Sequence, residues 1–188
     1  MADLIQNSIG YKELKSFQKA TIIYDLTYYF CHTYLRGGDR TVDQMVQAAR
    51  SGKQNIAEGV VASSTSHETL LKLLNVAKAS LHELLVDYED YLRVHGYRLW
   101  AKDSAEVQQV RMWGKTENNP EFYLRRAHEG DAAFLANMAI VLIYQASYLL
   151  DRHLQSAGER FLKEGGFRER LSRYRIAARN EEGKKWNR

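Results

Sequence analysis

The sequence predicts an all-α protein: an antiparallel up-and-down four-helix bundle over residues 1–155, followed by a basic helical extension over residues 156–188. The chain has 188 residues and a single proline, Pro120, so the long stretches on either side of it contain no strong helix breaker. Within these stretches, apolar residues recur at alternating spacings of three and four, as on helices that pack side by side. The connections between them are short, which favours antiparallel neighbours.

The first helix is expected over residues 16–35. It is followed by Gly37 and Gly38, and glycine is the residue that most often ends a helix. Either Asp39 or Thr41 can cap the second helix, because Gln44 follows Thr41 by three residues in the pattern of a capping box.

The second helix has a packing seam in which glycine occupies two positions. Glycine in a helix interior costs about 1 kcal/mol relative to alanine, so Gly52 and Gly59 need a compensating reason. A glycine that faces a neighbouring helix lets the two backbones approach closely, and we expect this packing role rather than a ligand-binding one. The seam consists of Val42, Met45, Ala49, Gly52, Ile56 and Gly59.

The third helix begins near Ser66, after a polar hinge, and ends near residues 94–97. Its apolar seam runs through consecutive heptads without interruption. After it, residues 98–128 are less regular: residues 103–113 can form a short helix, and residues 114–122 are interpreted as a loop. The seam consists of Leu70, Leu74, Ala77, Leu81, Leu84, Tyr88 and Tyr91.

The fourth helix starts near Asp131 and is apolar on nearly every face. Between residues 134 and 150, only Asn137, Gln145 and Ser147 are clearly polar. A four-helix monomer would cover one side of such a helix and leave the rest exposed. We therefore expect a further surface, from the tail or from another subunit, to cover it.

Positive charge is concentrated at the C-terminal end of the chain. The whole chain carries +4, whereas residues 166–188 carry eight basic and three acidic side chains, so the remainder is nearly neutral. Gly165 and Gly166 stop the fourth helix, and a basic helix follows with Phe167, Leu171 and Tyr174 on one face. Clustered basic side chains bind phosphates by releasing counterions; the alternative is a solvated or disordered end. The candidate nucleic-acid-binding residues are Arg168, Arg170, Arg173, Arg175, Arg179, Lys184 and Lys185.

Composition indicates a soluble protein of the reducing cytoplasm. Cys31 is the single cysteine, which excludes an intrachain disulfide. The first residues show no basic segment followed by an apolar core, so no signal peptide is expected. The longest apolar run, residues 138–144, is far shorter than the ~20 residues that span a bilayer, and we expect no membrane contact.

The sequence lacks the common patterns of catalytic and metal chemistry. No glutamate is followed by histidine three residues later, as di-metal sites in helical bundles require. The Gly52–Lys53 pair lacks the other residues of a phosphate-binding loop. Cys31 and His32 are adjacent, so on a helix their side chains point about 100° apart. The histidines show no metal-ligand spacing, and we expect no enzyme activity, no cofactor and no metal.

Polar residues beside the seams have two interpretations. Asn55 and Ser80 fall next to seam positions, whereas Arg50, Glu58 and Glu83 fall on outward faces. One interpretation is a solvated surface, where exposed ion pairs contribute about 0–1 kcal/mol. The other is a polar contact between subunits, and the spacing fits both equally.

These residues also carry a resemblance. Residues 50–59 and 67–85 resemble the four-helix-bundle family of bacterial proteins encoded in 23S ribosomal RNA intervening sequences, which includes the accessory variability protein of diversity-generating retroelements. Residues 142–175 resemble the extension of its four-helix-bundle suffix subgroup, whereas residues 98–128 are longer than the family's usual connection. The matching motif residues are Asn55, Ile56, Glu58, Gly59, Ala77, Ser80, Glu83 and Leu84.

The resemblance implies a homo-oligomer, with a pentamer known for the retroelement member, and no enzyme. For that member alone it implies a nucleic-acid or reverse-transcriptase partner. Our leading hypothesis is a non-enzymatic homo-oligomeric scaffold that binds RNA or DNA electrostatically through its tail. The alternative is a protein–protein adaptor, for example a partner of a reverse transcriptase. The expected subunit contacts are Arg50, Asn55, Glu58, Gly59, Ser80 and Glu83.

Overall fold

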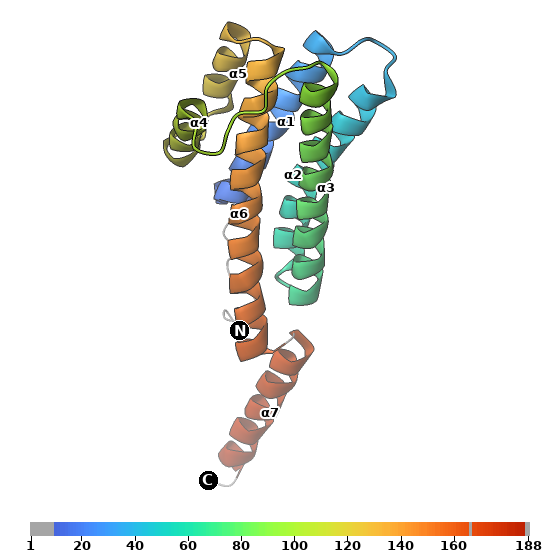
Figure 1. Cartoon of the computed structure of the whole chain (residues 1–188). Coiled ribbons are helices and arrows are strands. Elements are labelled where there is room, and N and C mark those ends of the chain that lie inside the picture. Colours follow the sequence, from blue (N-terminus) through green and yellow to red (C-terminus); the bar gives the residue numbers. More distant parts are fainter. Residues whose placement is uncertain (1–9, 166, 187–188) are drawn as a thin grey trace.

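The computed structural model describes residues 10–165 and 167–186, and these residues are all-α, as predicted (Figure 1). No strand occurs among them, and a short 3-10 helix, η2, precedes the first long helix. The elements are η2 (Tyr11–Glu13), α1 (Lys15–Tyr34), α2 (Arg40–Ala62), α3 (His67–Val94), α4 (Ala105–Thr116), α5 (Pro120–Glu129), α6 (Ala132–Glu164) and α7 (Phe167–Trp186).

Four long helices, α1, α2, α3 and α6, lie side by side and run in alternate directions (Figure 1). Each contacts two of the others: α2 packs on α1 and α3, and α6 packs on the same two helices. The apolar seams predicted for α2 and α3 face this core. Its fully buried large side chains include Ile22, Leu26, Phe30, Met45, Ile56, Leu74, Leu81, Leu84 and Tyr88.

Side-chain caps fix where α2 and α6 begin. The Asp39 carboxylate accepts a hydrogen bond of 2.9 Å from the Thr41 backbone N–H, so Asp39 rather than Thr41 caps α2. Asp131 likewise accepts a bond of 2.7 Å from the Phe134 N–H and caps α6 at the predicted place. Such a cap contributes about 1 kcal/mol by satisfying an N–H that has no partner within the helix.

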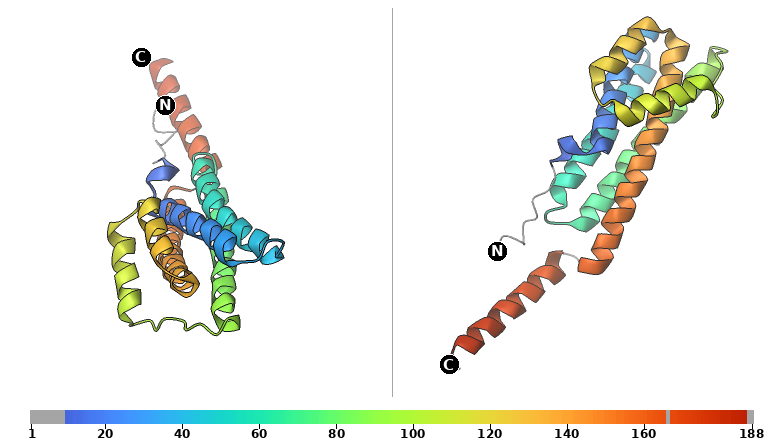
Figure 2. Two further views of the ribbon diagram at one scale, coloured as in Figure 1. Left: turned by 90° about the horizontal axis from the view of Figure 1, so that it is seen from above. Right: turned by 90° about the vertical axis from the view of Figure 1, so that its left-hand side faces the viewer.

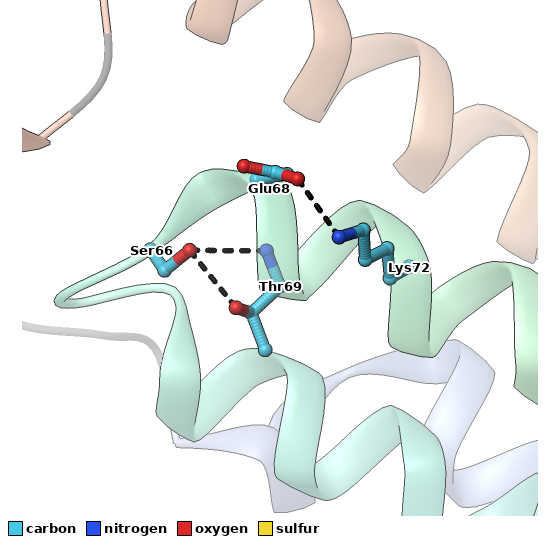
Figure 3. Close-up of polar contacts among 4 residues, drawn as sticks. All are labelled: Ser66, Glu68, Thr69 and Lys72. Carbon is cyan, nitrogen blue, oxygen red and sulfur yellow. Dashed lines mark hydrogen bonds and ion pairs between the residues drawn. The ribbon is translucent and has the colours of Figure 1, made fainter.

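A side chain at the end of the hinge between α2 and α3 also caps the helix that follows (Figure 3). The Ser66 hydroxyl accepts bonds from the Thr69 N–H at 3.1 Å and from the Thr69 hydroxyl at 2.9 Å. One turn further on, Glu68 and Lys72 form an exposed i,i+4 ion pair at 2.8 Å, which adds a few tenths of a kcal/mol. The polar hinge predicted from the sequence therefore caps α3 at Ser66.

Gly52 and Gly59 are buried where α2 meets α3, as predicted. A Cβ on Gly52 would lie 2.8 Å from Leu81 Cδ2 and 2.9 Å from its Cγ, and a Cβ on Gly59 would lie 3.2 Å from Leu73 Cβ. Leucine side chains of α3 therefore pack directly on the α2 backbone at these glycines, and the packing gained offsets the low helix propensity.

The region after α3 differs from the prediction. Of residues 114–122, which were expected to form a loop, the first three belong to α4 and the last three to a further helix, α5, so only residues 117–119 separate the two helices. The Asn119 side chain accepts a bond of 3.0 Å from the Glu121 N–H, and Pro120 is the first residue of the helix. Proline favours this position because its missing N–H would have no partner there. Here Pro120 starts a helix rather than interrupting one.

The cover predicted for α6 comes from within the same chain. Every residue from 135 to 143 is buried, and α4 packs on α6 with Val107 and Val110 buried. The expectation that the tail or another subunit must cover this stretch is therefore wrong: residues 98–128 do so. Figure 1 shows the chain crossing α6 before it enters α4. Further along α6, Tyr144 and Tyr148 remain 57% and 60% exposed.

The continuity of α6 also bears on the predicted domain boundary. α6 runs unbroken to Glu164, so the boundary drawn between residues 155 and 156 falls inside it. The break comes at Gly165, whose φ of 74° lies in the left-handed region that glycine adopts without strain. Figure 2 shows α7 extending beyond this end of the molecule.

By length and composition, the α6 segment Ala132–Lys163 could cross a membrane, yet 61% of its most apolar window is buried inside the protein. A mostly buried core helix passes the same test, so the finding is weak evidence for a membrane span.

The α2–α3 contact predicts that a side chain at position 52 destabilises the fold. We expect Gly52→Leu to lower the free energy of unfolding by about 1–3 kcal/mol, because overpacking costs that much in a close-packed contact. Gly158→Leu in α6 is the matched control, since a Cβ there meets nothing within 4 Å; it should leave stability unchanged or raise it by up to about 1 kcal/mol. Urea denaturation measures both, and equal effects would contradict the assignment.

Candidate functional site

The structure brings two of the motif residues together through a serine that the motif does not include. The Ser51 and Ser80 hydroxyls lie 2.9 Å apart. Asn55 donates from Nδ2 to the Ser51 hydroxyl at 3.0 Å and to the Ser51 carbonyl at 2.9 Å. Ser80 is buried, whereas Ser51 and Asn55 are half-buried. The Ser51–Ser80 bond connects α2 to α3, and the Asn55 bonds, which stay within α2, orient the Ser51 hydroxyl, so the first role of these residues is structural.

Beside this cluster, a polar groove of about 730 Å³ runs between α2 and α3. Ser80 and Glu83 line it together with Asp43, Asp87 and Arg40. Burial raises the pKa of the Asp87 carboxyl above its usual value, and the nearby carboxylates of Asp90 and Glu83 raise it further. The groove therefore has a surplus of negative charge and suits a basic or hydrogen-bond-donating group.

The remaining motif residues lie apart from the groove. Arg50 and Glu58 are exposed on α2, and Gly59 is part of the packed seam.

On α3, Glu83 belongs to an exposed row with Val76, Ala79 and Val86. The row has spacings of three, four and three, which is the spacing of a helix seam that packs on another helix. Within the described residues, no other helix of this chain covers it.

The basic tail forms α7. Arg173, Arg175 and Arg179 are exposed, and the i,i+4 pair Arg175 and Arg179 shares one helix face. Tyr174 is 46% exposed, which is more than a packed residue would be. The predicted binding residues Arg168, Arg170, Lys184 and Lys185 belong to α7, but their side chains lie outside the part of the structure that is described.

Sequence reasoning missed Lys19, the most buried charged side chain among the described residues. It is 1% exposed, and its ammonium donates to the Gly114 carbonyl at 2.9 Å near the end of α4. The ring of Tyr123 lies 5.6 Å from Nζ. Burial lowers the pKa of Lys19 to about 8, and the carboxylate of Glu117 partly opposes this shift.

A signal for Lys19 was present in the sequence. Lys19 precedes Ile22 by three residues and Ile23 by four, so it occupies a position on the apolar stripe of the first helix. A lysine on such a stripe either reaches solvent or meets a specific partner. In this structure the Lys19 ammonium donates to a carbonyl in the last turn of α4. This carbonyl has no hydrogen-bond donor within its own helix.

The thiol of the single cysteine has low reactivity. Cys31 is buried against Met45, with 3.9 Å between the two sulfur atoms. Burial raises the pKa of the thiol to about 12, and the carboxylate of Asp87 adds to the rise. The reactive thiolate is therefore scarce at neutral pH. Across residues 10–165 and the described part of α7, no three His, Cys, Asp or Glu side chains are placed to share a metal ion.

Comparison with known proteins finds no matching family model, no similar curated protein and no similar solved structure. Membership of the intervening-sequence family therefore stays a prediction that depends on the motif residues alone.

The buried ammonium predicts a specific dependence of stability on pH. The folded-state pKa of Lys19 is about 8, below the ordinary 10.5, so between these pH values the folded protein releases a proton before the unfolded chain does. Stability should therefore rise with pH over this window, relative to a Lys19→Met variant that cannot titrate. Urea denaturation of both proteins from pH 7 to 10.5 measures the difference.

Lys15→Met is the control for this comparison, because Lys15 lies on the same helix and is exposed. Its stability should follow that of the wild type across the whole range. Parallel curves for the wild type and Lys19→Met would contradict the assigned environment of Lys19.

Proposed function

We propose that this chain is a non-enzymatic, cytoplasmic, homo-oligomeric scaffold that binds RNA or DNA through α7. In this proposal, α1, α2, α3 and α6 form an antiparallel up-and-down four-helix bundle, and α7 is its basic extension. The observation that carries the proposal is the group of exposed arginines, Arg173, Arg175 and Arg179, on α7, which extends beyond the end of the bundle (Figure 2).

The charge and isolation of α7 support a polyanionic partner. The helix carries seven basic and three acidic residues. Helices in proteins gain most of their stability by packing an amphipathic face, and α7 keeps its described side chains at 171–177 and 179–180 exposed. Phosphates would supply the contacts that the bundle does not, and binding would release counterions with little dependence on base sequence. Tyr174 offers a face on which an unpaired base can stack.

The exposed row on α3 supports self-association. Val76 and Val86 are 47% and 42% exposed, and both lie on the same face as Ala79 and Glu83. A second copy could pack on this row and place a basic side chain in the acidic groove beside it. This contact would use the motif residues Glu83 and Ser80. Five subunits is the number suggested by the family resemblance.

The proposal that α7 binds nucleic acid is tested by replacing its exposed arginines with glutamine. We expect the triple variant Arg173→Gln, Arg175→Gln, Arg179→Gln to bind labelled single-stranded RNA more weakly and with a flatter salt dependence. Each lost phosphate contact reduces the slope of log affinity against log salt by about 0.7 on single strands. Fluorescence anisotropy at several salt concentrations measures both effects, with circular dichroism to confirm the fold.

The control for this experiment is the triple variant Arg36→Gln, Arg98→Gln, Arg125→Gln, which removes the same charge from exposed sites outside α7. It should retain most of the affinity and the slope. Equal losses in the two variants would exclude α7 as the binding surface. If the intact protein bound neither RNA nor DNA at low salt but bound one protein tightly, the adaptor hypothesis would replace this one.

Self-association is tested by light scattering. The wild type should have a mass of several 21.8 kDa subunits, and the double variant Val76→Glu, Val86→Glu should have a lower mass with unchanged helix content. Repulsion and loss of apolar contact on the α3 row would cause the dissociation. Met112→Glu is the control, because Met112 is 56% exposed on α4. A monomeric wild type, or a double variant of unchanged mass, would overturn the α3 contact.

A further inference from the structure

A second, larger groove lies between α4 and α6, on the face of the molecule that the insertion creates. Its volume is about 1100 Å³, and the beginning of α1 closes one end. Small-molecule sites are clefts of roughly 300–1,000 Å³, so the space is large enough for such a ligand. None of the motif residues of α2 and α3 lines it.

Polar contacts fix the first wall of this groove in place. Asn137 of α6 is 2% exposed, and its side chain bonds both to Ala133 of its own helix and to the segment that leads into α4. Its Oδ1 accepts from the Trp100 N–H at 2.8 Å, and its Nδ2 donates to the Arg98 carbonyl at 3.0 Å. The Trp100 ring then packs on Phe134 with 5.5 Å between ring centres. This end of the insertion is therefore held to α6 by a buried amide.

The opposite end of α4 is held by two further side chains. Lys19 donates to the Gly114 carbonyl at 2.9 Å, and Gln145 Nε2 donates to the Arg111 carbonyl at 3.0 Å. A Cβ at position 114 would overlap the Gln145 side chain, so glycine permits this approach. Because the segment before α4 and the C-terminal half of α4 are both held in place, the groove between α4 and α6 is already formed without a ligand.

The groove combines an apolar interior with a cationic end. Toward the N-terminal half of α4 it is lined by Trp100, Val107 and Ile140. Toward the C-terminal half lie Lys15, Lys19 and Lys115. Lys102 and Arg111 also line the groove, and the Arg111 guanidinium donates to the Lys102 carbonyl, just before α4, at 3.1 Å. Glu89 is the single acidic residue of the lining, and its carboxylate accepts a hydrogen bond of 3.4 Å from the Tyr144 hydroxyl. Positive charge in the groove is therefore largely uncompensated.

We propose that the α4–α6 groove binds a small anionic amphiphile, with its apolar body along Trp100, Val107 and Ile140 and its anionic head at the end formed by Lys15, Lys19 and Lys115. Apolar burial provides most of the affinity of such a ligand, at about 0.8 kcal/mol for each CH₂ group removed from water. The cationic end provides its selectivity, since charge-assisted hydrogen bonds are about twice as strong as neutral ones.

Lys19 explains why an anion fits better than a neutral or cationic molecule. Its ammonium has three donors, and one of them bonds to the Gly114 carbonyl. A buried charge is costly unless an opposite charge lies close to it, and Glu117 opposes only part of the effect of burial. A ligand head group would supply that charge. The basic helix α7 of another copy is a poor occupant for the same electrostatic reason.

Isothermal titration calorimetry of the full chain tests this proposal with four probes: three amphiphiles at concentrations below micelle formation, and adenosine monophosphate. Decanoate should bind with one site per subunit, whereas butyrate, which has the same head and a shorter body, should bind at least ~100-fold more weakly. Decyltrimethylammonium, which has the same body and the opposite charge, should not bind. Equal affinity for the cationic and anionic amphiphiles, or tighter binding of adenosine monophosphate than of decanoate, would overturn the proposal.

Matched variants locate the site. Lys15 and Lys115 are exposed at the cationic end, so the double variant Lys15→Gln, Lys115→Gln should fold normally and lose ~10-fold or more in decanoate affinity. The double variant Lys12→Gln, Lys163→Gln removes the same charge away from the groove and should bind as the wild type does. Trp100→Phe should abolish most of any change in tryptophan fluorescence on binding. Equal losses in both lysine variants would place decanoate elsewhere and contradict the proposal.

Discussion

The requirement to bury residues 135–143 of α6 on every side determines how this chain is organised. A helix with consecutive apolar residues from 138 to 143 cannot lie at the surface of a bundle. Two of the long helices cover part of it, and the insertion between α3 and α6 supplies the rest. The connection is long because it must leave α3, cross α6 and return as α4 and α5 before α6 itself begins. The groove between α4 and α6 is a by-product of this arrangement.

The packing of α2 on α3 follows a different physical rule. Where α2 meets α3, the glycines at positions 52 and 59 leave room for leucine side chains of α3 to pack directly on the α2 backbone. Polar bonds among Ser51, Asn55 and Ser80 then fix the register of the two helices. Thus the motif residues that first suggested a function also have a plain structural role, and what is left for a partner is the outward row that includes Glu83.

Much of the fold could be predicted from the sequence because it depends on local signals. The seams of α2 and α3, the cap at Ser66 and the stop at Gly165 all come from residues within a few positions of one another. Pro120 misled the prediction because proline breaks a helix in its interior but favours its first turn. The cover of α6, the position of Lys19 and the second groove depend on contacts between distant residues, such as Lys19 with Gly114, which no periodicity reveals.

The position of α7 has a consequence for binding strength. It follows the end of a core helix with only residues 165 and 166 between them, so the subunits of an assembly with cyclic symmetry would display their α7 helices at the same end. A long polyanion held by one such helix would meet the next at a high effective concentration, and the combined avidity could exceed that of a single helix by a factor of ~10²–10⁴. Weak, non-specific contacts on each helix would then suffice for firm attachment, and losing the assembly would cost as much affinity as losing the arginines.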